Sequence, residues 1–505
     1  MQELVSQPEI RSSSEILTAP YIQEEGSSFI ETLLKEGRLV RDFENPEQME
    51  NGRNMLRDLI TEVLEGELTL DQNLENQILQ LIADIDQVIS NQVNEIIHQA
   101  KFQVLEGTWR GLERLVFETE TGPLLKINVL DAKKEELYRN FEAAPDVETA
   151  SYFHRIYRDE FDTYGGTPYG CVIGDYYFDV TKNRDYKLLG WISQAAASGL
   201  CPFITGVSPT TFGWKSFTEH TDKRDVRPIF GQAELLKYQK LRETEDSKFL
   251  GLVFPRYLSR DPYNENTYES EYFNFREDVD GMDDSKFCYS NSAYLVAGNI
   301  TRAWAMTHWP AAIRGVEGGG IIEDLPVHLF KTDEGDTAIK CPTEVLISDR
   351  REKEFAGLGF IPVVYKKDSD VACVFSMQSI YKPKKYDRTI ANASEYLSSQ
   401  LQYLMCALRM GHYLKVTLRE KTGSSYERNE LEEFINRYLS GFVLTGSGHT
   451  QEEKAQQPFK ELKASLEEDP NRPGCYKAVV YARPHYQLDE INVSLRLVPE
   501  IPKRK

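Results

Sequence analysis

Residues 188–207 read LLGWISQAAASGLCPFITGV, a segment of helical character followed at once by a short apolar run. We expect residues 188–197 to form a helix and residues 203–207 to form a strand. The same alternation recurs through the middle of the chain. Further strands are predicted at 124–130, 171–173, 249–254, 327–330, 345–347 and 371–375, and a further helix at 293–308. This order of elements predicts an α/β core in which helices flank a mixed sheet.

The composition is that of a folded protein, because 40% of the 505 residues are hydrophobic and 28% are charged. The 59 Lys and Arg residues against 80 Asp and Glu give a net charge of −21, which argues against nucleic acid as a partner. No apolar run approaches the ~18–20 residues needed to span a bilayer, so we expect no direct membrane insertion. The polar, acidic start of the chain lacks the pattern of a signal peptide, and we expect a cytoplasmic protein.

Acidic charge is concentrated near the N-terminus. Residues 1–100 hold 6 basic and 20 acidic residues, a net charge of −14 (6 − 20). Residues 1–28 have the composition of a flexible arm, and residues 29–34 form a short amphipathic stretch. A long helix is predicted over about 70–98, where apolar residues recur at three-to-four spacing. Its apolar stripe fits a helix packed on its own core, which we favour, or a helix between subunits.

The C-terminal end alternates apolar and polar residues twice, over 476–482 and 491–498, after a helical region at 391–418. Period-two alternation predicts two strands, and we expect them to form a hairpin connected by residues 483–490. Because this hairpin lies near a chain end, it can pair with the sheet of its own subunit or with that of a neighbour. The apolar residues expected to take part are Tyr476, Ala478, Val480, Ile491, Val493, Leu495 and Leu497.

Little in the sequence points to catalysis or to a cofactor. The eight histidines are scattered and the seven cysteines form no CxxC pair, so the spacing typical of metal ligands is missing. The glycine-rich run at 315–320 lacks the residues of a phosphate-binding loop, and a tight turn or a close backbone approach is the favoured interpretation. We predict no catalytic residue, no cofactor and no metal.

One charged group follows a predicted strand and consists of Asp349, Arg350, Arg351 and Glu352. Carboxylates beside arginines are compatible with an acid/base site. A cytosolic α/β hydrolase that uses Asp349, Glu352 and one histidine is therefore an alternative function. No obvious nucleophile or metal ligand accompanies the group, so we predict an ion-paired corner that holds two elements, or two subunits, in register.

Many short strings, in order along the chain, resemble one family. They are FQVLEGTWRGL (102–112), PFITGVSP (202–209), FPRY (254–257), AIRG (312–315), GGG (318–320), DLP (324–326), PTEV (342–345), SDRRE (348–352), GFIP (359–362), HYLK (412–415), PHYQL (484–488) and SLRLV (494–498). Together they resemble the large sheath subunit of the type VI secretion system, the TssC/VipB/IglB family. One departure lies at residues 98–102, which read HQAKF where the family often has His-Pro-Glu before the Phe.

The resemblance implies a structural protein rather than an enzyme. The chain would pair with a small sheath subunit of the TssB/VipA type, and further copies would stack into a helical lattice around an inner tube of Hcp-type rings. The sheath would meet baseplate components and be anchored to the envelope through them and a membrane complex. Its contraction would propel the tube and effectors out of the cell. Terminal strands would be exchanged between neighbouring subunits in a shared sheet.

The resemblance also implies a recycling site and a domain division. The amphipathic stretch with Phe29, Ile30, Leu33 and Leu34 lies at the family position of the helix recognised by a ClpV-type AAA+ unfoldase. We expect residues 1–70 to be an arm with a short helix, 71–378 an N-terminal sheath domain and 379–505 a C-terminal sheath domain that ends in the exchanged hairpin. A sheath protein of a related phage-tail-like contractile particle is the other alternative.

Overall fold

The computed structural model describes most of the chain. The described residues are 46–64, 74–219, 226–264, 273, 275–281, 283–332, 335–421, 423–424, 426–446, 448–468, 476–485 and 487. The chain divides into two compact units, Met1–Ile89 and Ser90–Lys505. The predicted unfoldase residues Phe29, Ile30, Leu33 and Leu34 lie outside the described residues, and so do Ile491, Val493, Leu495 and Leu497.

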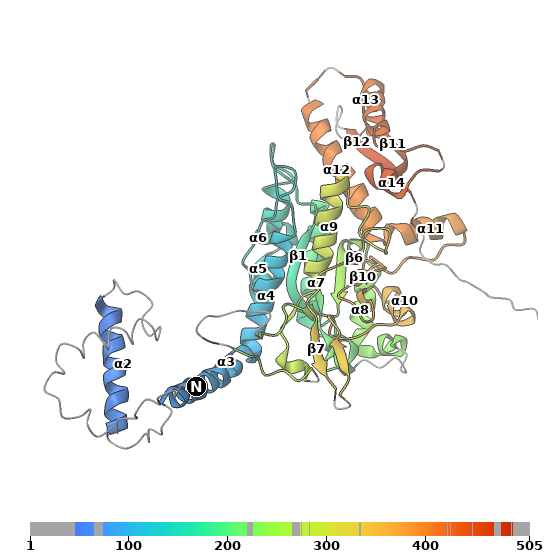
Figure 1. Ribbon diagram of the computed structural model, residues 1–505. Coiled ribbons are helices and arrows are strands. Elements are labelled where there is room, and N and C mark those ends of the chain that lie inside the picture. The colour runs from blue at the N-terminus through green and yellow to red at the C-terminus, as the bar shows by residue number, and fades with distance from the viewer. Residues whose placement is uncertain are drawn as a thin grey trace, which may run out of the picture. The chain divides into compact units, whose positions relative to one another are not determined.

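The first unit contains α2 (Pro46–Leu64) and the first part of α3 (Leu74–Ile97) (Figure 1). Helix α3 confirms the long helix predicted over 70–98. Its apolar side chains recur at helical spacing but are exposed, Ile85 to 57% and Val88 to 65%. The described part of the first unit does not cover this stripe, and the favoured interpretation of a helix packed on its own core stays a prediction.

A six-stranded mixed sheet is the centre of the second unit and confirms the predicted α/β fold (Figure 1). In spatial order its strands are β1 (Val172–Phe178), β2 (Phe203–Val207), β3 (Leu250–Phe254), β9 (Ile361–Tyr365), β10 (Ala372–Val374) and β6 (Ile321–Ile322). The first four run parallel, whereas β10 is antiparallel to both β9 and β6. Every residue of β2, β3 and β9 is buried, as expected for parallel strands covered on both faces.

Successive residues of these strands enter two different hydrophobic cores, because side chains alternate between the faces of a sheet. Phe203 and Leu252 belong to the larger core, whereas Ile204 and Val253 belong to the second. Among the helices that contribute to the larger core are α7 (Asn183–Gly199), α8 (Leu236–Arg242) and α10 (Asp349–Gly357), and those that contribute to the second include α9 (Ala293–Thr307) and α12 (Leu401–Lys421). Helices thus cover both faces of the sheet.

Helix α4 (Ala100–Phe117) packs on α9 and on the short strand β5 (Tyr289–Ser290) through two glycines. A Cβ on Gly107 would lie 2.4 Å from the carbonyl oxygen of Tyr289. A Cβ on Gly111 would lie 2.4 Å from Cδ2 of Tyr294. The two glycines therefore set how closely α4 approaches the core.

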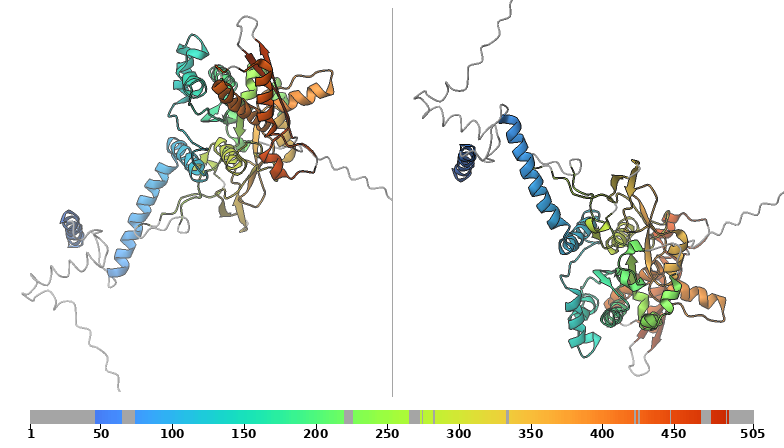
Figure 2. Two further views of the ribbon diagram at one scale, coloured as in Figure 1. Left: turned by 90° about the horizontal axis from the view of Figure 1, so that it is seen from above. Right: turned by 90° about the horizontal axis from the view of Figure 1, so that it is seen from below.

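A third hydrophobic cluster forms the C-terminal part of the second unit. It is built from α12, α13 (Arg428–Ser440) and β11 (Phe459–Glu468), and includes Ile435 and Phe459, both fully buried. Strand β11 pairs antiparallel with β12 (Tyr476–Pro484), and α13 packs on β11 (Figure 2).

The remaining elements complete the second unit. The helices are α5 (Lys134–Ala143), α6 (Ser151–Phe153), α11 (Thr389–Ser398) and α14 (Gln451–Gln456). The strands are β4 (Tyr257–Leu258), β7 (His328–Lys331) and β8 (Thr337–Lys340). Strand β4 pairs with β5, and β7 pairs with β8. Helix α11 extends away from the sheet in Figures 1 and 2, and none of its residues is buried.

Three sequence predictions of secondary structure need correction. Residues 124–130 form no strand; Ile127 packs on the small cluster around Leu115, but no neighbouring described strand offers its backbone a hydrogen-bonded ladder. Residues 345–347 are irregular, and Ile347 is buried as a loop residue in the larger core. The helical region at 391–418 is two helices, α11 and α12, which are separated at Ser399 and Gln400.

Candidate assembly site

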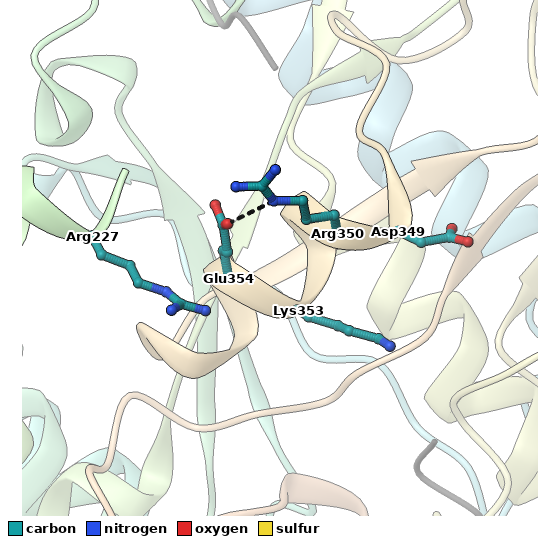
Figure 3. Close-up of a pocket in the computed structure, with 5 residues that line it drawn as sticks. All are labelled: Arg227, Asp349, Arg350, Lys353 and Glu354. Carbon is teal, nitrogen blue, oxygen red and sulfur yellow. Dashed lines mark hydrogen bonds and ion pairs between the residues drawn. The ribbon is translucent and has the colours of Figure 1, made fainter. Parts of the chain in front are cut away.

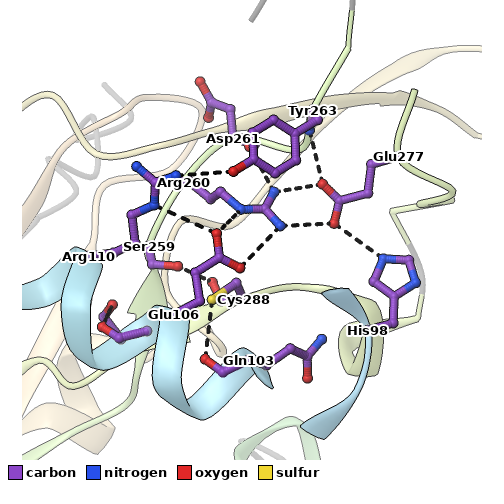
Figure 4. Close-up of polar contacts among 12 residues, drawn as sticks. His98, Gln103, Glu106, Arg110, Ser259, Arg260, Asp261, Tyr263, Glu277 and Cys288 are labelled. Carbon is purple, nitrogen blue, oxygen red and sulfur yellow. Dashed lines mark hydrogen bonds and ion pairs between the residues drawn. The ribbon is translucent and has the colours of Figure 1, made fainter. Parts of the chain in front are cut away.

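A buried charged cluster joins α4 to the loop that follows β4 (Figure 4). Arg260 lies between two carboxylates: its Nε is 2.6 Å from Oε1 of Glu106 and its Nη1 is 2.6 Å from Oε2 of Glu277. The Arg260 side chain is 9% exposed and that of Glu277 is 1% exposed. Burial lowers the pKa of Arg260, but hydrogen bonds to Glu277 and Glu106 raise it by more, so the guanidinium stays charged.

Further polar contacts extend this cluster to His98, the residue that follows α3, and to Arg110. Nε2 of His98 lies 3.2 Å from Oε1 of Glu277, and the backbone N–H of Tyr263 donates to Oε2 of Glu277 over 2.9 Å. Arg110 donates to the hydroxyl of Tyr263 over 3.1 Å. The cluster therefore fixes the middle of α4, and the residue that follows α3, on the core (Figure 4). His98 contributes although the residues after it depart from the family pattern.

The opposite face of α4 is apolar and exposed. The side chains of Phe102, Leu105 and Trp109 recur at helical spacing and are 37%, 55% and 63% exposed. We call this surface, completed by Val116 and Phe117, the α4 face. Exposed apolar patches rimmed by polar residues mark interaction sites. Sequence reasoning used residues 102–112 as a family string but did not separate the buried glycines from these exposed side chains.

The predicted ion-paired corner lies on α10 (Figure 3). Nε of Arg350 is 3.2 Å from Oε1 of Glu354, and Arg351 also pairs with Glu354. Glu354 is therefore the carboxylate that serves both arginines, and the sequence analysis did not single it out. Glu354 lies four positions after Arg350 and three after Arg351, and this helical spacing could have revealed the pairing.

The other two predicted corner residues have different surroundings. Glu352 accepts a hydrogen bond from the hydroxyl of Ser376 and is thereby tied to the segment after β10. Burial raises the pKa of Glu352, and the hydrogen bond from Ser376 and the charges of Lys353 and Arg314 oppose the shift. Asp349 is in the first turn of α10, after the N-cap residue Ser348.

A surface depression of about 480 Å³ adjoins this corner (Figure 3). It is lined by Arg227, Asp349, Arg350, Lys353 and Glu354. These are three cations and two carboxylates, so neither a histidine nor a hydroxyl or thiol nucleophile accompanies Asp349 there. The depression therefore lacks the histidine on which the hydrolase alternative depends. Among the described residues, no group of three or more His, Cys, Asp and Glu side chains is arranged to hold a metal ion.

The strand predicted at 476–482 is confirmed as β12, but its partner is a strand that the sequence analysis missed. Ala478 and Val480 lie opposite Leu466 and Ala464 of β11, and Tyr476 lies opposite Glu468. Residues 459–468 alternate apolar and polar at 462, 464 and 466, a period-two signal that could have identified β11. Pairing of β12 with residues 491–498 stays a prediction, because those residues lie outside the described part.

Apolar side chains remain exposed on β12. Val479, Val480 and Tyr481 are 41%, 36% and 57% exposed. Ala478 and Ala482 pack on the third hydrophobic cluster. Strand β12 therefore packs on the third hydrophobic cluster and also leaves apolar side chains exposed, on which another segment could pack.

Comparison with known proteins identifies the family. The VipB model described as "EvpB/VC_A0108, tail sheath N-terminal domain" matches residues 79–381, and the companion model described as "EvpB/VC_A0108, tail sheath gpW/gp25-like domain" matches residues 390–501. The type VI secretion system sheath protein TssC1 of Pseudomonas aeruginosa is 40% identical over 453 residues, which cover 89% of this chain and 91% of that protein. The chain belongs to the VipB family of tail sheath proteins and is a contractile sheath subunit of the type VI secretion class.

Two solved structures of the anti-feeding prophage are similar at low identity. Its baseplate gives a TM-score of 0.33 at 9% identity, covering 74% of this chain and 83% of that chain. Its helical sheath in the contracted state gives a TM-score of 0.29 at 10% identity, covering 77% of this chain and 86% of that chain.

Among the described residues, no helix has both the length and the apolar character that crossing a membrane requires.

Proposed function

We propose that this chain pairs with a small sheath subunit and that the pairs polymerise into a helical tube around an Hcp-type inner tube. The observation that carries the proposal is 40% identity to a type VI sheath protein over 89% of the chain. When identical units contact each other head to tail and the rotation between neighbours does not close a ring, they form an open helical filament. Contraction of that filament would propel the inner tube and effectors out of the cell, with no cofactor and no nucleic acid involved.

The α4 face is the surface we assign to the small subunit. Leu105 and Trp109 lie one helical turn apart, and both are more than half exposed on a helix whose other face is anchored in the core. A second helix can place its own apolar stripe on such a row of side chains. Large aromatic residues at the centre of an interface carry much of its binding energy.

The exchange of terminal strands is the contact we assign to further copies of the chain. Strand β12 presents Tyr476, Val480 and the neighbouring apolar residues at the surface. Main-chain hydrogen bonds along an added strand hold two subunits together whatever their side chains. Ile491, Val493, Leu495 and Leu497 are the residues proposed to supply the exchanged strand, together with Tyr476, Ala478 and Val480.

The remaining parts of the proposal rest on family membership. We assign Phe29, Ile30, Leu33 and Leu34 to recognition by a ClpV-type unfoldase, and the ends of the sheath to baseplate components. We place the protein in the cytoplasm, in a sheath anchored to the envelope through the baseplate and a membrane complex. The division at residues 378 and 379 is supported by the two family models and by the separate hydrophobic cluster around Ile435.

Co-expression with a small sheath subunit of the TssB/VipA type tests the proposal. We expect tubes in negative-stain electron micrographs of the purified complex. Deletion of residues 476–498 should abolish tubes while the sheet core stays folded by circular dichroism. Discrete monomers or small closed oligomers from the full-length pair would contradict the sheath function. A normal yield of tubes from the truncated chain would contradict strand exchange but not the sheath function.

The α4 face has its own test. Trp109→Ala should weaken binding of the small subunit by about 2 kcal/mol or more, which is roughly 30-fold in Kd. The substitution should leave the thermal unfolding of the chain unchanged, because Trp109 is 63% exposed. Tyr164→Ala is the matched control, an aromatic residue 77% exposed outside α4. Equal binding by both variants would exclude the α4 face as the docking surface.

A further inference from the structure

Of the described residues that follow β12, Gln487 makes three hydrogen bonds to residues outside the β11–β12 hairpin. Its backbone N–H donates to the hydroxyl of Tyr403 over 2.8 Å. Its side-chain Nε2 donates to the carbonyl oxygen of Ala311 over 3.1 Å, and its Oε1 accepts from Nε of Arg314 over 3.0 Å. Both ends of the amide are therefore satisfied at once, which fixes its position and orientation. We call the three partners, Ala311, Arg314 and Tyr403, the Gln487 socket.

The socket lies outside the β11–β12 hairpin, although Ala311 packs on the third hydrophobic cluster, which includes β11. Arg314 is 6% exposed and precedes the glycine-rich run, and Tyr403 is 8% exposed on α12. The backbone N–H of Gly315 donates to the carbonyl oxygen of Val374 in β10, and the N–H of Val374 donates back to Gly320. The turn that follows Arg314 is thus joined directly to the central sheet.

The glycines of this run are required by the same packing. A Cβ on Gly318 would lie 2.3 Å from the carbonyl oxygen of Arg314 and 3.8 Å from Nε2 of Gln487. A Cβ on Gly320 would lie 2.6 Å from the carbonyl oxygen of Val374. Residues 315–320 therefore form the close backbone approach that the sequence predicted, and this approach forms one side of the socket.

The position of Gln487 has a mechanical consequence. Pulling on a hairpin strand from its end breaks its ladder one hydrogen bond at a time, and each such bond contributes only about 1 kcal/mol. Strand β12 ends at Pro484, and the N–H of His485 still bonds to Pro458 beside β11. A force applied beyond Gln487 meets the socket before it reaches this ladder.

We propose that Gln487 is the anchor residue of the C-terminal segment, which transmits tension from residues beyond 487 to Arg314 and the central sheet instead of to β12. This inference rests on the proposed strand exchange for the origin of the tension, whereas the anchor itself rests on the three hydrogen bonds. The residue acts by positioning the chain, and the socket accommodates a neutral amide that both donates and accepts.

A graded set of variants tests the anchor in the purified complex with the small subunit. Gln487→Leu keeps the approximate shape of the side chain and removes both side-chain hydrogen bonds, whereas Gln487→Glu keeps an acceptor for Arg314 and loses the donor to Ala311. Hydrogen exchange of the peptide 476–487 should accelerate about tenfold in Gln487→Leu and less in Gln487→Glu. Gln457→Leu is the control, because Gln457 makes one long side-chain hydrogen bond of 3.5 Å, to Gly441.

The same samples test the role of Gln487 independently of the proposed sheath function. We expect wild-type and Gln457→Leu tubes to survive shearing as long tubes, and Gln487→Leu tubes to break into short pieces in electron micrographs. Unchanged exchange in Gln487→Leu, or sheared tubes as long as the wild type, would overturn the anchor even if tubes form. Accelerated exchange in a complex that forms no tubes at all would support the anchor and refute the proposed assembly.

Discussion

Nε of Arg260 lies 2.6 Å from Oε1 of Glu106, and the two residues are 154 positions apart in the sequence. Their side chains are 9% and 11% exposed. This pair, with Glu277 on the other side of the guanidinium, is what holds α4 on the sheet core by charge. The same helix carries the α4 face, so this ion pair helps to hold that face in position.

Removing the cation from this cluster should destabilise the protein strongly. Arg260→Leu leaves Glu106 and Glu277 buried without their shared partner, and breaking a buried pair in this way costs about 3–5 kcal/mol. The measurement is denaturant-induced unfolding of the purified chain. Arg184→Ala is the control, because it breaks a pair with Glu135 in which the two side chains are 59% and 45% exposed. An equal effect of both substitutions would contradict the role given to Arg260.

A methyl group at the contact between α4 and β5 should also destabilise the fold. In Gly107→Ala the added carbon would lie 2.4 Å from a backbone oxygen of Tyr289, so the helix has to shift. We expect a loss of about 1–3 kcal/mol from over-packing, despite the higher helix propensity of alanine. Gly122→Ala meets nothing within 4 Å and is the matched control in the same thermal unfolding experiment. Stability equal to that of the control would show that α4 does not approach so closely.

His412 should make the stability of the protein depend on pH. Burial, with smaller effects from Arg409 and Lys415, lowers its pKa to about 4, and a hydrogen bond with the carbonyl oxygen of Gly199 opposes the shift. Because the folded state binds the proton more weakly than the unfolded chain does, stability is complete above a pH of about 6.5 and falls as the pH drops towards 4. The difference between 6.5 and about 4 corresponds to about 3 kcal/mol.

The variant His412→Gln isolates this contribution, because glutamine does not titrate. Thermal unfolding of the wild type should weaken between pH 7.5 and pH 4.5 by more than that of the variant. Other acidic and basic groups affect both proteins alike, so the difference between the two curves reports His412. Parallel curves for the two proteins would show that the ring is accessible to protons in the folded state.

Much of the fold could be predicted from local pattern. Strand β3 and helix α7 were identified because uninterrupted apolar runs and helical periodicity are properties of neighbouring residues. The segment at 124–130 was misassigned for the complementary reason. A strand requires a hydrogen-bonded neighbour, and the sequence of one segment does not say whether another lies beside it.

The candidate site was predictable only in part. Arg350 and Arg351 were singled out by their charge, but their partner Glu354 became evident only once residues three and four apart met on one helix. The Arg260 cluster had no sequence signal, because Glu106 and Glu277 come from distant segments that carry no common motif. The glycine-rich run was interpreted as a tight turn or a close backbone approach, and the structure shows the close approach, yet nothing in its sequence indicated that Gln487 lies against it.

The sequence by itself determined the class of fold, the family and the positions of most helices and central strands, since these follow from periodicity and from strings that persist in order along the chain. The tertiary structure decided which charges are paired, which face of α4 is left exposed and where the chain is held after β12. These are relationships between residues far apart in the sequence. They depend on the entropy of closing long loops and on the desolvation of buried charge, and neither quantity is encoded in a local stretch of residues.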